Sequence, residues 1–214
     1  MTAGAGGREE LANTVTHGFG LVASVAAGAV LITLASLSGD PWQITGASIY
    51  VASLVLLYAA STLFHAVRSP RLKARLRVFD HCAIFGLIAG TYTPFTLGPM
   101  RGGWGWTLFG VAWGMALAGT IMKLFWTGRF PLLSTLFYLS MGWMVVFAAR
   151  PLYLTLPGTV IVWIVAGGLL YSVGTIFYLD RRRYSHAVWH LFVLAGSACH
   201  YAAVVGQLVV DLPA

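Results

Sequence analysis

The stretch PGTVIVWIVAGGLLYSVGTIFYL, residues 157–179, contains no charged side chain and is followed directly by Asp180 and three arginines. A helix rises 1.5 Å per residue, so about 20 apolar residues cross the hydrocarbon core of a bilayer. Six other stretches have a similar length and apolar character: 18–36, 43–66, 79–98, 104–124, 131–149 and 186–209. The sequence therefore predicts an all-α, polytopic membrane protein built as a bundle of seven transmembrane helices.

The composition excludes an ordinary water-soluble domain. Hydrophobic residues make up 58% of the chain and charged residues only 9%, whereas soluble domains average about 25% charged residues. The connections are short, so we expect one membrane domain over 1–214, with 1–16 as a short cytoplasmic N-terminal segment. That segment carries Arg8, Glu9 and Glu10 and does not resemble a cleavable signal peptide. Cys82 and Cys199 fall within predicted helices and are expected to be free thiols.

The basic residues are distributed unevenly between the two predicted faces. If the seven segments alternate in direction, eleven lysines and arginines share the side of the N-terminus, and only Arg101 and Arg150 lie on the other side. The positive-inside rule then places the N-terminus in the cytoplasm and the C-terminus outside the cell membrane. The formal net charge of +7 is thus a topology signal, with anionic lipid headgroups as its expected contact. Nucleic acid is not an expected partner.

Histidines and an acid gather at the predicted cytoplasmic ends of three segments. His186-Ala-Val-Trp-His190 opens the last segment, and its spacing places both imidazoles on one side of a helix. His65 closes the second segment, and Asp80 opens the third. Ionisable residues are costly inside membrane proteins and usually mark functional sites. Three imidazoles match the protein ligands of a catalytic zinc site, so His65, His186 and His190 are candidate ligands of Zn²⁺.

Asp80 and Ser61 are the candidate catalytic residues. A carboxylate near zinc can accept a proton from water that the metal has made more acidic. Ser61 precedes His65 by one helical turn and can orient that water or a substrate carbonyl. The alternative is that these side chains cap helices or reach toward headgroups. The spacing of the two histidines, together with the nearby acid, favours the metal.

Other polar positions leave alternatives open. Glu10, Asn13 and His17 form one helical stripe that either supports the metal ligands or caps and packs the first helix, and we favour the packing role. His81 is expected to bond a loop or a headgroup. His200 lies about 15 Å beyond His190 along the helix, too far to share an ion, and is expected to be a bonded histidine of the bundle interior.

Five ordered motifs resemble those of the bacterial hemolysin III family: Glu10-x2-Asn13-x2-Thr16-His17-Gly18, Ser61-x3-His65, Phe79-Asp80-His81, Gly90-Thr91-Tyr92-Thr93-Pro94-Phe95 and His186-x3-His190. That family belongs with the progestin and adipoQ receptors, and the similarity covers about residues 8–206. The resemblance implies seven helices and a zinc ion held near the cytoplasmic face by His65, His186 and His190. It also implies a water-mediated position for Asp80, with Ser61 beside it. Alkaline ceramidases resemble this arrangement, which implies hydrolysis of a lipid amide.

Several functions follow from these features. The first is a zinc-dependent intramembrane hydrolase of lipid amides or esters, with membrane lipids or a fatty acid as partners and a cavity that ends at the metal. The second is a metal-stabilised receptor or sensor involved in lipid homeostasis. A pore-forming hemolysin is disfavoured because no segment shows a polar stripe along its full length. A proton channel or transporter is disfavoured because His200 is the only ionisable residue expected near the middle of the bilayer.

Overall fold

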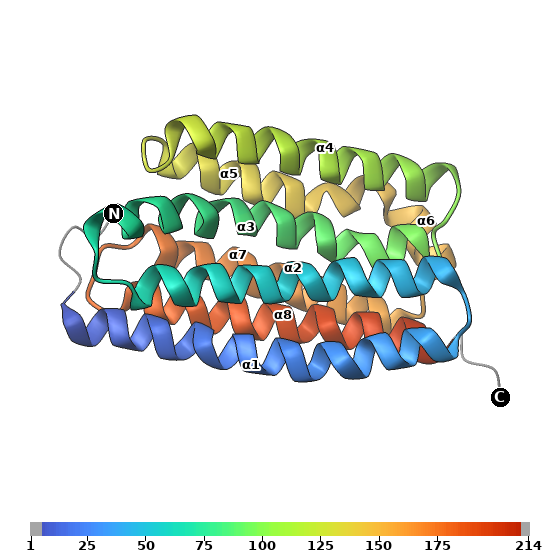
Figure 1. Ribbon diagram of the computed structural model, residues 1–214. Coiled ribbons are helices and arrows are strands. Elements are labelled where there is room, and N and C mark those ends of the chain that lie inside the picture. Colours follow the sequence, from blue (N-terminus) through green and yellow to red (C-terminus); the bar gives the residue numbers. More distant parts are fainter. Residues whose placement is uncertain (1–5, 211–214) are drawn as a thin grey trace.

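The computed structural model describes residues 6–210, and the described residues form one bundle of helices without a strand (Figure 1). In chain order the elements are α1 (Gly7–Leu37), α2 (Pro41–Ala66), α3 (Pro70–Leu97), α4 (Gly103–Trp126), α5 (Pro131–Gly142), the 3₁₀ helix η1 (Trp143–Ala148), α6 (Ala149–Thr155), α7 (Gly158–Leu179) and α8 (Ser185–Val210). The predicted all-α class is confirmed.

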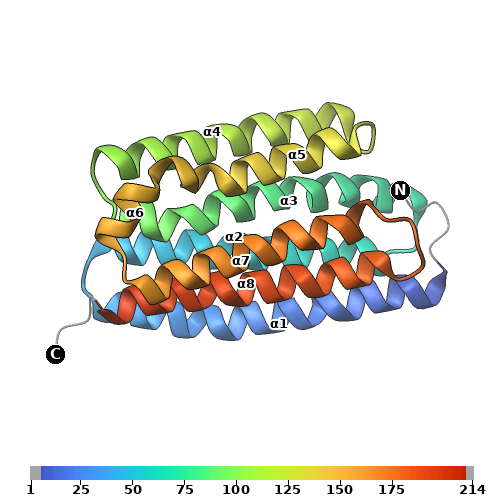
Figure 2. The ribbon, with the colours of Figure 1, turned by 180° about the vertical axis from the view of Figure 1, so that it is seen from behind.

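Six helical segments of the described chain are long and apolar enough to cross a membrane: α1, α2, α4, the α5–η1–α6 segment, α7 and α8. They lie alongside one another, and α1 begins at the end of the bundle opposite to the end of α8 (Figures 1 and 2). Helix α3 lies among them but carries four basic residues in its first turns, followed by Asp80 and His81, and it is less apolar than the six. The protein is therefore a multi-pass membrane protein of six apolar helical segments and α3.

Two helices begin earlier than their apolar stretches predict. Helix α1 begins at Gly7, so residues 7–16 of the predicted N-terminal segment are its first turns, while residues 1–5 lie outside the described residues. Helix α3 begins at Pro70, and its first turns carry basic side chains that we expected in a connection. Both helices extend beyond the apolar stretch because polar side chains are compatible with helical backbone at the water-facing end of a span.

The α5–η1–α6 segment differs from the single helix expected over 131–149. The α-helix ends at Gly142 and continues as the 3₁₀ helix η1 and then as α6. At the change, the Tyr92 hydroxyl of α3 donates to the Gly142 carbonyl (2.7 Å) and accepts from the Val145 amide (3.0 Å). A helix can change its winding inside a membrane only where its freed backbone groups find such partners. The partner comes from α3, so the stretch itself did not predict the break.

Close packing places the first turns of α1 against the helix ends that carry the histidines. Helix α1 packs along α2 and α8. At Gly20 a Cβ atom would lie 2.7 Å from both Leu194 and Tyr58, so only glycine allows this approach. Helices α7 and α8 also pack extensively, whereas α5 has few contacts with α3, α4 or α7. The bundle is thus tight around α1, α2 and α8 and loose around α5.

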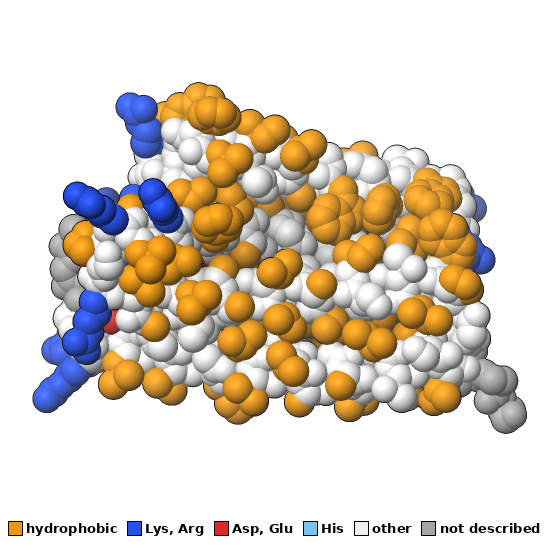
Figure 3. Space-filling model, viewed as in Figure 1, with side chains coloured by type: hydrophobic (Ala, Val, Ile, Leu, Met, Phe, Trp, Pro, Cys, Tyr) orange, Lys and Arg blue, Asp and Glu red, His pale blue; other side chains and the backbone are white. Residues whose placement is uncertain are grey.

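The surface separates charge from apolar side chains. Lysines and arginines gather at the end where α1 begins, and apolar side chains cover the flank between the two ends (Figure 3). Large apolar side chains such as Phe19, Phe125 and Phe147 are well exposed on this flank and elsewhere, as expected for surfaces that face lipid. Lys123 is an exception among the basic residues. It is buried, and its Nζ donates to the Ser134 Oγ at 2.5 Å, so it does not contact headgroups as we expected.

Candidate metal centre

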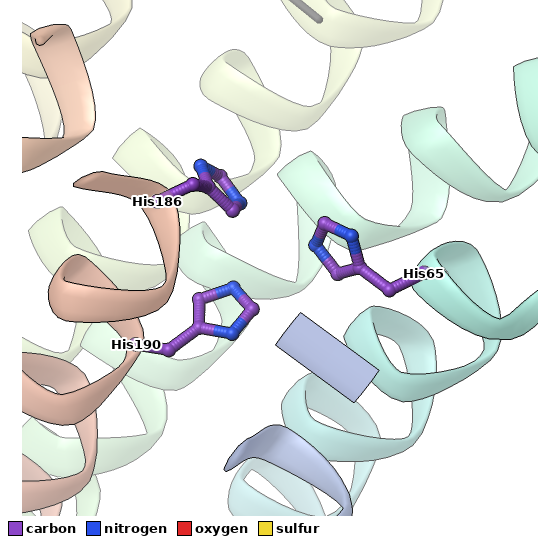
Figure 4. A group of neighbouring side chains, drawn as sticks. All are labelled: His65, His186 and His190. Carbon is purple, nitrogen blue, oxygen red and sulfur yellow. The ribbon is translucent and has the colours of Figure 1, made fainter. Parts of the chain in front are cut away.

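Three histidines from two helices face one another at the basic end of the bundle (Figure 4). His65 lies in the last turn of α2, and His186 and His190 lie in the first two turns of α8. One ring nitrogen from each can be chosen so that all three lie within 4.8 Å of one another. The ring centroids are 5.1, 5.1 and 4.8 Å apart. The structure therefore brings together the three residues that the sequence predicted as ligands.

The Nε2 atoms of His65, His186 and His190 share one property. Each is buried, and none has a hydrogen-bond partner among the described residues. Buried polar atoms without partners are rare because each costs free energy. Three of them at one point fit a cation, which accepts lone pairs from all three rings. The donor set thus suits a metal ion such as those that imidazoles bind.

Glu10 fixes the orientation of His65. Its Oε2 lies 2.8 Å from the His65 Nδ1, and its Oε1 lies 3.1 Å from the Lys73 Nζ. Because a carboxylate can only accept, the proton of His65 resides on Nδ1, and Nε2 keeps a free lone pair toward its neighbours. Metal-binding histidines commonly have a carboxylate at this position. Glu10 thus contacts a candidate ligand. From the sequence we favoured a packing role for Glu10, but this contact agrees with the alternative role of supporting the ligands.

Thr16 has the corresponding role for His190. The Thr16 Oγ1 lies 3.0 Å from the His190 Nδ1, and its own proton is directed to the carbonyl of Ala12 (2.9 Å) or Asn13 (3.0 Å). The hydroxyl oxygen therefore accepts from Nδ1–H, which again leaves the Nε2 lone pair free. The His17 ring stacks on His190 with centroids 3.4 Å apart and planes 10° apart, so the His190 ring is held on its face as well.

The loop before α8 is also held by the first turn of α1. Tyr184 has a φ of 62°, a left-handed conformation that is unusual for a bulky residue, and its amide donates to the Glu9 Oε1 at 3.1 Å. Ser185 donates to Asp180 at 2.8 Å. This hydrogen bond lowers the pKa of the Asp180 carboxyl, and Arg182 adds to the effect. The adjacent acids Glu9 and Glu10 thus position the beginning of α8 and the end of α2.

Asp80 and Ser61 are both buried beside the cluster, on α3 and α2. Asp80 is not one of the three residues whose ligand atoms lie within 4.8 Å of one another. The Ser61 hydroxyl lies beside the Asp80 carboxyl but forms no hydrogen bond of ordinary geometry with a described residue. The two side chains are therefore near the candidate ligands, with polar atoms available for a further partner.

Two cavities reach this region. The first, which we call the apolar chamber, extends from His17 and Asp80 past Tyr92 and Trp143 to His200, and its walls are mostly apolar. The second, the basic vestibule, lies at the charged end and is lined by His65, His186, Asp80, Lys73, Arg77 and Arg181 to Arg183. Asp80 lines both. The candidate centre therefore lies where an apolar cavity and a polar cavity approach each other.

The remaining histidines lie outside the metal cluster. His81 is buried and lines the vestibule, and its carbonyl accepts from the Tyr138 hydroxyl at 3.2 Å. His200 is buried along the chamber and stacks on Tyr171, with centroids 5.4 Å apart. A Cβ atom on Gly167 would lie 2.6 Å from the His200 Nε2. The predicted interior position of His200 is confirmed, but its buried Nδ1 has no hydrogen-bond partner among the described residues, so the expected bond is absent at this atom.

Buried polar residues continue along α8, contrary to our expectation that no segment carries a long polar stripe. His190, Ser197, His200 and Gln207 are all buried on one side of this helix. The hydroxyls of Tyr58 and Tyr171 each lie 2.8 Å from the Ser197 Oγ. The stripe was overlooked because apolar residues separate its members in the sequence, and two of its hydrogen-bond partners are tyrosines, which count as hydrophobic.

The fold and the buried histidines define a class: a helical membrane protein with a three-histidine site that can hold a metal ion. Comparison with known proteins identifies the family. The family described as "Haemolysin-III related" matches residues 7–201, and the chain belongs to this family. The resemblance indicated by the five motifs is therefore confirmed.

Individual relatives agree with this assignment. The chain is 46% identical over 199 residues to the "Hemolysin-3 homolog" of Bacillus subtilis (strain 168), covering 92% of this chain and 93% of the relative. It is 45% identical over 199 residues to the "Hemolysin-3" of Bacillus cereus, covering 92% and 91%. It is also 32% identical over 210 residues to the human "Monocyte to macrophage differentiation factor", covering 92% and 83%. The similarity thus extends over most of each chain.

Proposed function

We propose that this protein is a zinc-dependent intramembrane hydrolase that cleaves lipid amides or esters. The observation that carries the proposal is the convergence of three imidazoles, each with a buried and unpartnered Nε2 atom, near Asp80, which lines the apolar chamber. Catalytic zinc sites use three protein ligands and keep one position open for water or substrate. Three imidazoles without a fourth protein ligand in the cluster match that requirement.

Each group of the centre has a role in the proposed reaction. When bound, zinc supplies a Lewis acid that polarises a substrate carbonyl and lowers the pKa of water. The Asp80 carboxylate accepts a proton from the attacking water and delivers it to the departing nitrogen or oxygen. The Ser61 hydroxyl orients the water or the carbonyl. The apolar chamber takes up the acyl chain and keeps bulk water from the reacting groups.

The proposal includes the membrane topology. We take α3 as a seventh span because it has 28 residues and lies among the six apolar segments (Figure 1). Its polar residues Asp80 and His81 are buried inside the bundle, so they do not oppose crossing as lipid-facing charges would. With seven spans the basic end is cytoplasmic by the positive-inside rule, and the C-terminus lies outside.

The test combines metal analysis with hydrolysis by the purified full-length protein. We expect about one zinc per chain and release of fatty acid from a lipid amide such as a ceramide. His190→Ala should lose the metal and the turnover together. Asp80→Asn should keep the metal and the fold but lose turnover by about a hundredfold or more, the usual contribution of general acid–base catalysis. Turnover by metal-free protein, or full activity of Asp80→Asn, would refute the mechanism.

A second candidate is a metal-stabilised sensor of lipids. It is supported by the two helices that carry the candidate ligands. His65 lies on α2, and His186 and His190 lie on α8. A metal held by all three would join two helices that have few other contacts with each other. Metal binding would then contribute directly to folding. In this case zinc removal should lower the unfolding temperature strongly, while Asp80→Asn should leave every lipid-dependent response unchanged.

Lysis of membranes is a third candidate, suggested by the name of the Bacillus cereus relative. The polar residues along α8 do not favour it, because Ser197 is bonded to Tyr58 and Tyr171 within the bundle. The apolar chamber beside them also lacks the polar walls of a water-filled pore. Release of a dye from vesicles by the purified protein would restore this candidate.

A further inference from the structure

The two cavities share more than Asp80. Tyr178 and Trp189 also line both the apolar chamber and the basic vestibule. On α8 the vestibule is lined by His186 and Trp189, and the Trp189 ring contacts those of His186 and His190 with centroids 4.8 and 5.2 Å away. A molecule with an apolar tail and a polar head can therefore occupy both cavities, with the joining bond beside the three histidines.

The vestibule has an excess of positive charge. Its lining includes Lys73, Arg77 and the three arginines Arg181 to Arg183, against the acids Glu9, Asp80 and Asp180. The acids at its rim are already engaged, since Glu9 accepts from the Tyr184 amide and Asp180 from Ser185. Lys73 is paired with Glu10. The arginines therefore supply most of the charge available to a ligand.

Arg77 is the arginine best placed to contact such a ligand. It lies on α3 one turn before Asp80, and its side chain passes Gly128 of the loop between α4 and α5. Its Nε is buried and has no hydrogen-bond partner among the described residues. A guanidinium group binds carboxylates and phosphates through two parallel hydrogen bonds. An unpartnered donor at the wall of a cavity points to an anionic group as its partner.

The positive-inside rule accounts for basic residues at this end of the protein but does not account for their arrangement. Arg75 lies on the same helix and at the same end, yet it is exposed and does not line the vestibule. Lys123 is near this end too, but it is bonded to Ser134 inside the bundle. Arg77 differs from both because it faces the cavity that contains His65 and His186.

We infer that the ligand is an acyl chain joined by an amide or ester to an anionic head that bears a carboxylate or a phosphate. The chain occupies the apolar chamber, and the head occupies the basic vestibule against Arg77. Cleavage of the bond rests on the proposed function, whereas binding of the anionic amphiphile does not. In the reaction, water adds its oxygen to the acyl carbon, the carbon–nitrogen or carbon–oxygen bond breaks, and the departing atom takes a proton. The products are a fatty acid and the anionic head.

The experiment compares amphiphiles that share an oleoyl chain; two are amides that differ in the charge of the head, and the third is an ester with a phosphate head. N-oleoylglycine carries a carboxylate, N-oleoylethanolamine carries a neutral hydroxyl, and 1-oleoyl-glycerol-3-phosphate carries a phosphate. Binding and hydrolysis are measured for each with the metal-loaded full-length protein in uncharged lipid nanodiscs. We expect an affinity and a kcat/KM about tenfold higher for an anionic amphiphile than for the neutral one, as for a hydrogen bond to a charged group. The anion that binds with the higher affinity identifies the head as a carboxylate or a phosphate.

Arg77→Gln and Arg75→Gln form a matched pair of variants. Both remove one positive charge from α3, so they change the surface potential alike. Arg77→Gln should reduce the preference for anionic heads to threefold or less, mainly through KM, and Arg75→Gln should preserve it. Equal binding of charged and neutral amphiphiles by the unmodified protein, or the same preference in both variants, overturns the inference.

The binding and hydrolysis measurements separate this inference from the proposed function. If the protein binds N-oleoylglycine in preference to N-oleoylethanolamine through Arg77 but cleaves neither, the hydrolase is refuted and the anionic head group stands. If it cleaves both equally well, the hydrolase stands and the inference fails. If it neither binds nor cleaves any of the three amphiphiles, both are overturned.

Discussion

Two buried polar regions of the bundle differ in how their atoms are partnered. At the basic end, His65, His186 and His190 direct three unpartnered nitrogens toward one another. Midway along α8, Ser197 is bonded to the hydroxyls of Tyr58 and Tyr171. The first region can hold a cation that would satisfy its lone pairs, whereas the second satisfies its hydroxyls within the bundle. Burial of polar groups alone therefore does not distinguish the two regions; the convergence of unsatisfied acceptors makes the first a candidate site.

The partners of the two regions also differ in charge. Glu10 places a carboxylate behind His65 and is itself paired with Lys73. The group around Ser197 contains only neutral hydroxyls and a neighbouring ring stack of Tyr171 with His200. A carboxylate behind an imidazole increases the basicity of the ring and so its affinity for a metal. The region at the basic end thus has the surroundings of a metal-binding histidine, whereas the middle region joins α2, α7 and α8 through hydrogen bonds.

Removal of a ligand should give the largest difference between the two regions. We expect His190→Ala to lose stoichiometric metal, because two imidazoles hold zinc much more weakly than three. His200→Ala should retain about one metal ion per chain, since this ring lies away from the cluster. Elemental analysis of both purified variants measures the difference. Metal retained by His190→Ala would show that the three nitrogens are not the binding site.

Loss of the charge behind His65 should have a smaller effect. Glu10→Gln keeps an acceptor for the His65 Nδ1–H but removes the negative charge, so metal affinity should fall about 10- to 100-fold. Glu9→Gln is the control, because Glu9 contacts the Tyr184 amide and not a histidine ring. Competition with a chelator of known affinity measures both. Equal affinities in the two variants would contradict the role given to Glu10.

Replacement of Thr16, the neutral partner of His190, should weaken metal binding less than replacement of Glu10, the charged partner of His65. Thr16→Val removes the acceptor for Nδ1–H at nearly constant volume, and we expect metal affinity to fall by about threefold to tenfold, since neutral hydrogen bonds are about half as strong as charged ones. Thr16→Ser should restore it. A loss in Thr16→Val that Thr16→Ser does not restore would indicate a packing effect of the methyl group instead.

The middle region should respond in stability alone. Tyr58→Phe removes the hydroxyl that bonds Ser197 but keeps the ring against His17, so unfolding should become easier by about 1 kcal/mol. Metal affinity should not change. Thermal unfolding in detergent, with and without added zinc, measures the two quantities separately. A loss of metal in this variant would show that the two regions are coupled.

Sequence patterns predicted much of this protein. The apolar stretches predicted the helical bundle, and the His186–His190 spacing predicted two imidazoles on one face. The prediction that His65, His186 and His190 lie close together is confirmed, and it could be made because each lies at the same predicted end of its segment. The break of the fifth span at Gly142 was not predicted, because the group that satisfies it is Tyr92 on another helix. The polar group around Ser197 was missed for the same reason.

The sequence by itself determined the all-helical, apolar character of the chain, the asymmetry of basic charge and the residue types at the candidate centre, because each depends on composition and on local helical period. Only the tertiary structure decided which ring nitrogen of His65 and of His190 is left without a partner. It did so by placing Glu10 behind His65 and Thr16 behind His190. Those contacts join residues 55 and 174 positions apart. Local spacing carries no information about such pairs, since their geometry arises from how the helices pack.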